Sequence, residues 1–358
     1  MKTIIQKIDK DNFIPEELNE AAKILQNGGL VAFPTETVYG LGGNGLDKDA
    51  SSKIYEAKGR PSDNPLIIHI ADIDSLEDLA NCIPENAKQL AKEFWPGPLT
   101  MILKKSNKVP HGTTGGLDTV AIRMPEHPIA LALIRQSGVY VAAPSANTSG
   151  KPSPTIAKHV IDDLDGKVDM IIDGGKVGIG LESTIIDLTG DAPVILRPGY
   201  ITKAMLEKVI GKVMVDKAIL SKNQDLNLIP KAPGMKYKHY APKGELTIFE
   251  GNNTAVISMI NKLAKEKALE GIQVGIIATE ETKHLYQYGK IKVIGSRKEE
   301  ASIARELYAV LREFDDVEAK YIYSESFTSD ELGQAIMNRL LKAAGYHVVQ
   351  VEEGSKEG

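Results

Sequence analysis

Apolar and polar positions follow two different periods along this chain. Short continuous apolar runs recur, as at 30–33, 66–70 and 99–103, and such runs are typical of buried strands. Between them, apolar residues are spaced three and four apart, as at 85–94 and 128–136, which predicts helices with one buried face. The alternation of the two patterns predicts an α/β fold.

The first alternation fills residues 10–205, which we predict to be one domain. Strands are predicted at 30–33, 66–70, 99–103, 120–124, 139–143, 170–172, 184–188 and 194–196. Helices are predicted near 50–57, 85–94, 128–136 and 155–163, and an earlier helix begins at Pro15 and ends at Gly28-Gly29.

A second alternation follows a segment of different composition. Residues 221–244 are rich in proline, glycine and lysine and show no regular period, so they are typical of a linker. We place the linker at 206–244 and a second domain at 245–358. Its strands are predicted at 246–249, 274–278, 291–294, 321–323 and 348–351, and its helices at 254–269, 299–314 and 330–344. This pattern predicts a smaller, doubly wound parallel sheet.

Composition narrows the class of protein. A chain of 358 residues is long enough for two domains, and 42% hydrophobic and 25% charged residues are typical of globular proteins. The net charge of −5 argues against a broad basic face for nucleic acid. Cys82 is the only cysteine, which excludes an internal disulfide and disfavours a cysteine zinc site. We expect no membrane span and a cytoplasmic location, since no long apolar run or secretion signal is found.

Two polar strings stand out as candidate walls of a polyanion site. KGRPSDNPL at 58–66 places Lys58 and Arg60 two residues apart, so that on an extended segment they share one side. PSANTSG at 144–150 places Ser145 and Asn147 in the same relation after a predicted strand. Cations, hydroxyls and amides of this kind bind phosphates. The alternatives are a solvated surface turn and an ordinary capped loop.

Other candidate residues also lie at predicted strand ends. His69 ends an apolar run, where a hydrogen-bonded core histidine is the default interpretation. Arg123 ends another, and a buried arginine needs an anion, from the protein or from a substrate. The segment 34–42 contains Thr35 and Thr37, and we expect its glycines, Gly40 and Gly42, to form a turn.

No serine elbow, cysteine–histidine pair or isolated catalytic carboxylate is found in the sequence. A reaction that depends on positioning and charge neutralisation therefore fits better than covalent catalysis. Phosphoryl and nucleotidyl transfers are reactions of this type.

At these residues the chain resembles the YrdC-type threonylcarbamoyl-AMP synthases in their long, two-domain form. The matching strings are FPTETVYGL (33–41), KGRP (58–61), NPL (64–66), WPGPLT (95–100), PSANTSG (144–150), STIID (183–187), LRPG (196–199) and, in the linker, APGMKYKHYAP (232–242). The resemblance implies a twisted, open α/β sheet domain with a concave cationic cleft. It also implies synthesis of L-threonylcarbamoyl-AMP from L-threonine, bicarbonate or CO2, and ATP, with release of pyrophosphate.

The resemblance also implies the roles of individual residues. Around ATP it implies Lys58, Arg60, Asn64, Thr119, Ser145, Asn147, Ser153, Arg197 and, from the linker, Tyr237, with Lys58 and Arg60 as the catalytic pair. Around threonine it implies Thr35, His69, Arg123, Ala143 and Ser183. We expect Mg²⁺ to accompany ATP, with no ligands assigned, and no organic cofactor.

The implied partners are the three small substrates and a separate enzyme that transfers the product to tRNA next to the anticodon. We expect synthesis itself to need no tRNA. Three alternatives remain: an RNA-binding module, the related carbamoyltransferases of hydrogenase maturation, and an ATP-dependent regulator in which the second domain acts. The single cysteine excludes the zinc fingers of the carbamoyltransferases.

Overall fold

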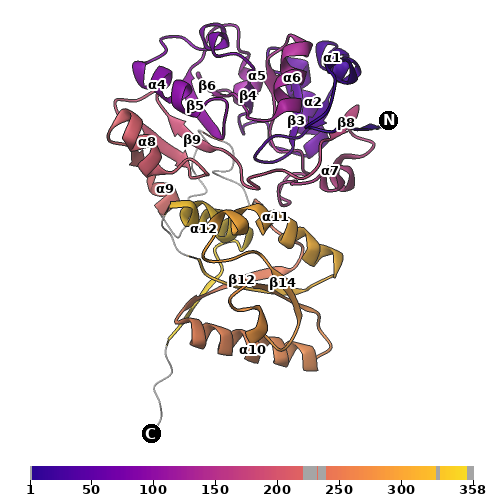
Figure 1. Cartoon of the computed structure of the whole chain (residues 1–358), viewed down its shortest axis with the longest axis vertical. Coiled ribbons are helices and arrows are strands. Elements are labelled where there is room, and N and C mark those ends of the chain that lie inside the picture. The colour runs from indigo at the N-terminus through magenta and orange to yellow at the C-terminus, as the bar shows by residue number, and fades with distance from the viewer. Residues whose placement is uncertain (1, 221–231, 233–238, 328–330, 353–358) are drawn as a thin grey trace. The chain divides into compact units, whose positions relative to one another are not determined.

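The computed structural model describes residues 2–220, 232, 239–327 and 331–352 and forms two compact units (Figure 1). The first unit comprises Met1–Ser149 and Ser153–Tyr237, and the second comprises Gly150–Pro152 and Lys238–Gly358. In both units strands alternate with helices, as the sequence pattern predicts. The fold class is confirmed.

The first unit is built on an 11-stranded mixed sheet with the order β1-β8-β2-β3-β7-β4-β6-β5-β9-β10-β11. The strands are β1 (Ile4–Lys7), β2 (Val31–Phe33), β3 (Gly40–Asn44), β4 (Ile67–His69), β5 (Leu99–Lys104), β6 (Thr119–Arg123), β7 (Val141–Ala142), β8 (Met170–Asp173), β9 (Thr184–Asp187), β10 (Val194–Arg197) and β11 (Met214–Val215). Strands β4 and β6 are parallel, while β7 and β5 run opposite to them. Carboxyl ends of strands therefore lie at both of the sheet's ends along the strand direction.

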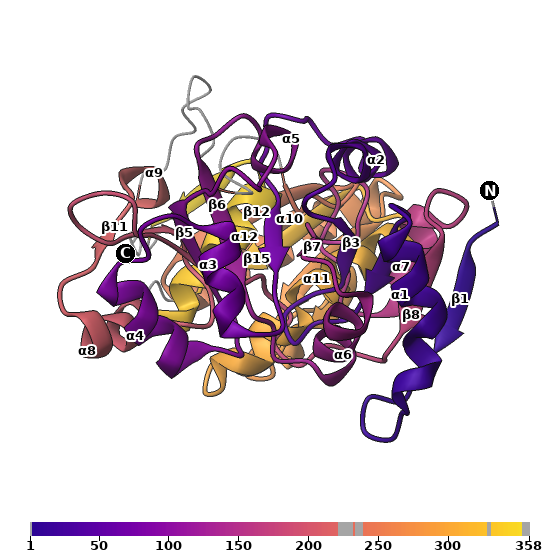
Figure 2. The ribbon, with the colours of Figure 1, turned by 90° about the horizontal axis from the view of Figure 1, so that it is seen from above.

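Helices cover both faces of one half of this sheet. Helices α1 (Asn19–Gln26) and α6 (Pro128–Ser137) pack side by side and share an apolar cluster with β2, β7 and β8 (Figure 2). On the opposite face, α2 (Lys48–Lys58) and α7 (Ala157–Leu164) pack against β3 and β8. Shorter helices are η1 (Pro15–Leu18), η2 (Ile73–Ser75), α3 (Leu76–Leu79), α5 (His111–Thr114) and α9 (Lys217–Leu220).

The other half of the sheet has two different faces. Ile68, Met101 and Ile122 belong to an apolar cluster that also contains residues of α4 (Glu85–Phe94) and α8 (Lys203–Ile210). The alternate residues Ile67 and Ala121 are paired across β4 and β6 and lie on the opposite face, which also carries the polar ends of these strands. This second face holds the candidate site.

The expected turn at Gly40 and Gly42 is wrong, because these residues belong to strand β3, antiparallel to β2. A Cβ atom on Gly42 would lie 2.7 Å from Val141 Cγ1 and 2.8 Å from Phe33 Cε1. The glycines therefore serve close packing between strands rather than chain reversal. The other strands and helices predicted for residues 10–205 are all present, most of them with shifted ends. The elements that were not predicted are β1, β11, α8 and the short helices other than η1.

The second unit contains a five-stranded parallel sheet with the order β14-β13-β15-β12-β16. Its strands are β12 (Glu245–Gly251), β13 (Val274–Ala278), β14 (Lys290–Val293), β15 (Tyr321–Glu325) and β16 (Val348–Val351), and a short turn of helix, η3 (Lys283–Leu285), follows β13. Helix α10 (Asn253–Leu269) lies on one face of the sheet, and α11 (Glu300–Asp316) and α12 (Glu331–Ala343) lie on the other (Figure 1). This confirms the predicted doubly wound parallel sheet.

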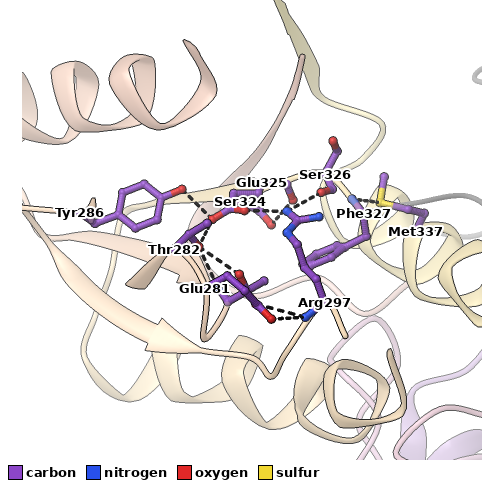
Figure 3. A network of polar contacts seen from close by, with 10 residues as sticks. Glu281, Thr282, Tyr286, Arg297, Ser324, Glu325, Ser326, Phe327 and Met337 are labelled. Atoms are coloured by element: carbon purple, nitrogen blue, oxygen red, sulfur yellow. Dashed lines mark hydrogen bonds and ion pairs between the residues drawn. The ribbon is translucent and has the colours of Figure 1, made fainter. Parts of the chain in front are cut away.

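A polar network links the carboxyl ends of β13, β14 and β15 in this unit (Figure 3). The buried Glu325 carboxylate accepts hydrogen bonds from Thr282 Oγ1, from Tyr286 OH at 2.8 Å and from Arg297 Nη2 at 2.6 Å. Glu281 accepts from Ser296 Oγ at 2.6 Å, and this bond lowers the pKa of its carboxyl to about 2. The carboxylates of this network accept hydrogen bonds from donors within the same network. The network therefore holds the loops after β13, β14 and β15 to one another.

Candidate functional site

One end of the candidate site is organised around Lys58, the last residue of α2. Its side chain is buried, and its ammonium group donates hydrogen bonds to the carbonyl oxygens of Ser145 and Asn147. Ser145 Oγ in turn donates to Asn147 Oδ1 at 2.6 Å, and Ser149 N donates to Lys58 O at 2.8 Å. The two polar strings singled out in the sequence are thus bonded to each other.

Arg60 and Asn64 lie beside the start of β4. Arg60 Nη2 donates to Pro65 O at 3.1 Å, and Tyr55 OH donates to Asn64 O at 3.2 Å. Burial raises the pKa of Tyr55 to about 12, so the phenol keeps its proton and remains a donor. Asn64 Oδ1 is buried and accepts no hydrogen bond from the described part of the chain, which leaves it open to a donor on a ligand.

The opposite end of the site is formed where β4 and β6 finish, at His69 and Arg123. These residues are paired in register, so their side chains lie on the same face of the sheet. Arg123 donates from Nη1 to Thr37 Oγ1 at 2.9 Å and from Nε to Gly97 O at 3.3 Å. Its Nη2 lies 2.6 Å from Glu36 Oε1 in an ion pair whose side chains are 5% and 10% exposed. The anion partner that the sequence required for Arg123 is therefore Glu36.

The other residues that were predicted to bind the substrate threonine either adjoin this end of the site or lie next to β4. Thr35 Oγ1 lies 2.8 Å from Thr37 Oγ1 in the loop that carries Glu36. Ser183 Oγ lies 2.7 Å from Thr100 Oγ1 and accepts a hydrogen bond from Arg197 Nη2 at 3.1 Å. Arg197, predicted beside ATP, thus contacts a residue predicted beside threonine.

Three further predicted residues have simple placements. Ala143 N donates to the carbonyl oxygen of Ile67, the first residue of β4, at 2.9 Å. Ser153 Oγ donates to the buried Glu182 Oε1 at 2.6 Å. Thr119 begins β6, while Tyr237 lies outside the described residues, as do 221–231 and the rest of 233–238 in the predicted linker.

The strand directions separate the candidate residues into two groups. Thr119 and Arg123 open and close β6, and four residues of strand span about 13 Å. Because β7 is antiparallel to β4, its carboxyl end brings Ser145 to the same end as Thr119. The fully buried Ala232 belongs to the same apolar cluster as Ile67 and Ala121. A residue of the predicted linker therefore lies on the face that carries both groups.

Comparison with known proteins identifies the family. A model of the Sua5/YciO/YrdC family, described as "Telomere recombination", matches residues 23–199, and one described as "Threonylcarbamoyl-AMP synthase, C-terminal domain" matches residues 201–345. The threonylcarbamoyl-AMP synthase of Bacillus subtilis is 52% identical over 335 residues, which cover 93% of this chain and 94% of that protein. The chain belongs to the threonylcarbamoyl-AMP synthase family.

Other members of the synthase family agree over the full length. The threonylcarbamoyl-AMP synthase of Pyrococcus abyssi is 52% identical over 331 residues, 92% of this chain and 95% of that protein. The crystal structure of P. abyssi Sua5 complexed with L-threonine superposes with a TM-score of 0.91 at 49% identity, covering 98% of this chain and all of that one. The two-domain resemblance drawn from the sequence is confirmed.

Two carboxylates of the site were not singled out from the sequence. Glu36 and Glu182 are both buried, and they pair with Arg123 and Ser153. Nothing in their immediate flanks isolates them, because each lies among threonines and serines in a polar loop. The signal that could have found Glu36 was the need of Arg123 for an anionic partner, but the sequence does not say which residue provides that partner.

In the described ranges, no group of three or more His, Cys, Asp or Glu side chains is arranged to hold a metal ion. Within the same ranges, no helix combines the length and the apolar composition needed to cross a bilayer.

Two buried histidines make stability depend on pH. Burial lowers the pKa of His69 to about 3 and that of His127 to about 4. Below about pH 6.5 the unfolded chain takes up protons at these residues while the folded chain does not. The free energy of unfolding therefore decreases as the pH is lowered from about 6.5 to about 4. We expect His127→Gln to flatten this slope in urea unfolding measured across that range. The same change at the exposed His284 should leave the slope unaltered, and an equal slope in all three proteins would contradict the assignment.

Proposed function

We propose that this protein makes L-threonylcarbamoyl-AMP from L-threonine, bicarbonate or CO2, and ATP, and releases pyrophosphate. The observation that carries the proposal is the pair of polar groups at the two ends of β6, one cationic and amide-rich, the other containing a buried arginine. A relative of known structure, P. abyssi Sua5, has been solved with L-threonine. The spacing of about 13 Å suits an amino acid placed against the phosphates of a nucleotide.

The chemistry that we propose is a nucleotidyl transfer. The amine of threonine attacks CO2 to form a carbamate, and the carbamate oxygen attacks the α-phosphorus of ATP, whose bond to pyrophosphate breaks. Arg60 supplies a fork of donors to the phosphates, while Lys58 holds the carbonyls of Ser145 and Asn147 beside them. Little covalent chemistry is required of the protein in such a transfer, so positioning and charge supply most of the catalysis.

The threonine end is proposed to provide specificity. Arg123 would bind the carboxylate of threonine, while His69 and Ser183 would bond its hydroxyl group. A site whose polar groups are built to bond a hydroxyl discriminates against analogues that lack one. His69 suits this role because its lowered pKa keeps the imidazole neutral, able both to donate and to accept.

Mg²⁺ belongs to the proposal only as the ion that ATP brings with it. Phosphate oxygens and water satisfy most of its coordination in such sites. We further propose that the product passes to a separate transferase that modifies tRNA, and that synthesis occurs in the cytoplasm without tRNA.

The test is a three-substrate assay of pyrophosphate release by the purified chain. We expect release from ATP only when L-threonine and bicarbonate are both present, no requirement for tRNA, and slow reaction with L-serine. Threonylcarbamoyl-AMP should appear in equal amount by mass spectrometry. Pyrophosphate release that is independent of threonine, or RNA binding without any turnover of ATP, would overturn the proposal.

A further inference from the structure

Glu36 is a buried carboxylate that the proposed chemistry has not yet used. Its side chain is 10% exposed, and its Oε1 atom lies 2.6 Å from Arg123 Nη2. Within the described part of the chain neither oxygen accepts a hydrogen bond of good geometry. Buried carboxylates usually accept several hydrogen bonds, so Glu36 retains acceptor capacity for a ligand.

Arg123 is held from other directions as well. Thr37 Oγ1 and Gly97 O accept from two of its guanidinium nitrogens, at 2.9 Å and 3.3 Å. The guanidinium is therefore fixed in place independently of Glu36. A buried ion pair is weakly stabilising at best, because desolvation offsets most of the attraction, so stability alone is a poor reason for Glu36.

The pair matches the charges of an amino acid. A zwitterionic α-amino acid presents a carboxylate and an ammonium group joined by a single carbon atom. Arg123 and Glu36 present a guanidinium and a carboxylate side by side, with the hydroxyls of Thr35 and Thr37 in the same loop. A ligand that carries both charges can satisfy both members without leaving either one unpaired.

We infer that Glu36 binds the α-ammonium group of L-threonine and accepts one proton from it. The inference rests on the proposed function and adds a residue to its threonine site. Binding through the ammonium would give the enzyme a way to reject hydroxy acids of the same shape. Proton removal would produce the neutral amine that the reaction requires.

The proton balance is complete when bicarbonate is the carbon source. Bicarbonate loses hydroxide to give CO2, and the ammonium of threonine gives one proton to the Glu36 carboxylate. The freed nitrogen lone pair forms the N–C bond to CO2, and one C–O π bond opens to place charge on oxygen. The nitrogen then loses a second proton to the hydroxide, which becomes water. One proton remains on Glu36 for each carbamate formed.

The competing interpretation is that Glu36 only neutralises Arg123. A comparison of two ligands separates the two interpretations without depending on turnover. L-Threonine and 2,3-dihydroxybutanoate of matching configuration differ only in the amino group, which a hydroxyl replaces in the second. We expect the wild-type chain to bind threonine at least tenfold more tightly in calorimetry at neutral pH.

In Glu36→Gln the preference for threonine should fall to about twofold or less, because the amide cannot balance the ammonium charge. General damage to the pocket would weaken both ligands together and preserve the ratio. The matched control is Glu126→Gln, an exposed glutamate close in sequence to Arg123, which should keep the wild-type ratio. If Glu36→Gln does not fold, Glu36→Asp serves instead and should give an intermediate ratio.

The outcomes distinguish this inference from the function on which it rests. A wild-type chain that binds neither ligand would count against threonine as substrate. A chain that binds threonine tightly, with the same preference in Glu36→Gln as in wild type, would overturn the role of Glu36 alone. A wild-type chain that binds both ligands equally would overturn it as well.

Discussion

Replacement of Lys58 by alanine is expected to reduce threonine-dependent pyrophosphate release about 100-fold or more while the chain remains folded. The ammonium group binds the carbonyls of Ser145 and Asn147, so its loss removes a charge and also releases the loop that it organises. Removal of a single preorganised donor from an active site commonly costs about 100- to 1000-fold in rate. The measurement is kcat for pyrophosphate release, together with the affinity for a non-hydrolysable ATP analogue.

Lys53 provides the matched control on the same helix. It is exposed and donates to Gly28 O at 2.7 Å, a residue that belongs to neither of the two polar strings. Lys53→Ala should keep turnover within about twofold. Normal turnover by Lys58→Ala would remove this residue from the nucleotide site and would weaken the proposed arrangement of the two strings.

Arg123→Lys is expected to raise the KM for L-threonine about 100-fold and to change the KM for ATP much less. Lysine preserves the charge opposite Glu36, which avoids an unpaired buried carboxylate, but it cannot reproduce the fork of donors that contacts Thr37, Gly97 and Glu36. Loss of bidentate carboxylate recognition in a buried site accounts for an effect of this size. Steady-state kinetics with each substrate varied in turn provides the measurement.

Arg135 offers the comparison for this second prediction. It lies on α6 with half of its side chain exposed, and pairs with Asp72 at 3.5 Å. Arg135→Lys should leave both KM values close to those of the wild type. An unchanged KM for threonine in Arg123→Lys would show that the carboxylate of the substrate binds elsewhere.

The sequence predicted the regular elements well where their period was clear. Helix 85–94 has the predicted bounds, and all five strands of the second unit were foreseen. The clearest of them is β13, whose sequence VGIIA is a continuous apolar run that is buried along its whole length. Strand β3 was missed because glycine has low strand propensity, and its use there depends on Val141 and Phe33, which approach from neighbouring strands. Strand β1 was missed because two of its four residues are polar.

The site shows the same division between local and long-range information. Lys58, Arg60, Ser145 and Asn147 can be recognised in two short strings of the sequence, and in the structure the hydrogen bonds of Lys58 connect the two strings. Glu36 could not be assigned, since its importance depends on Arg123, a residue distant in sequence that sheet register and loop packing bring beside it. The separation of the candidates into two groups also requires strand directions, and a mixed sheet does not reveal these in a linear pattern.

The alternation along β4 and β6 has an evolutionary consequence. Ile68 and Ile122 face the helices, while Ile67, His69, Ala121 and Arg123 lie on the face that holds the candidate site. Neighbouring positions along one strand are therefore under different constraints. Substitutions at the first set are limited by the volume of the side chain, and substitutions at the second set are limited by its chemical groups. A change of substrate preference can therefore arise in these strands without altering the side chains that pack against the helices.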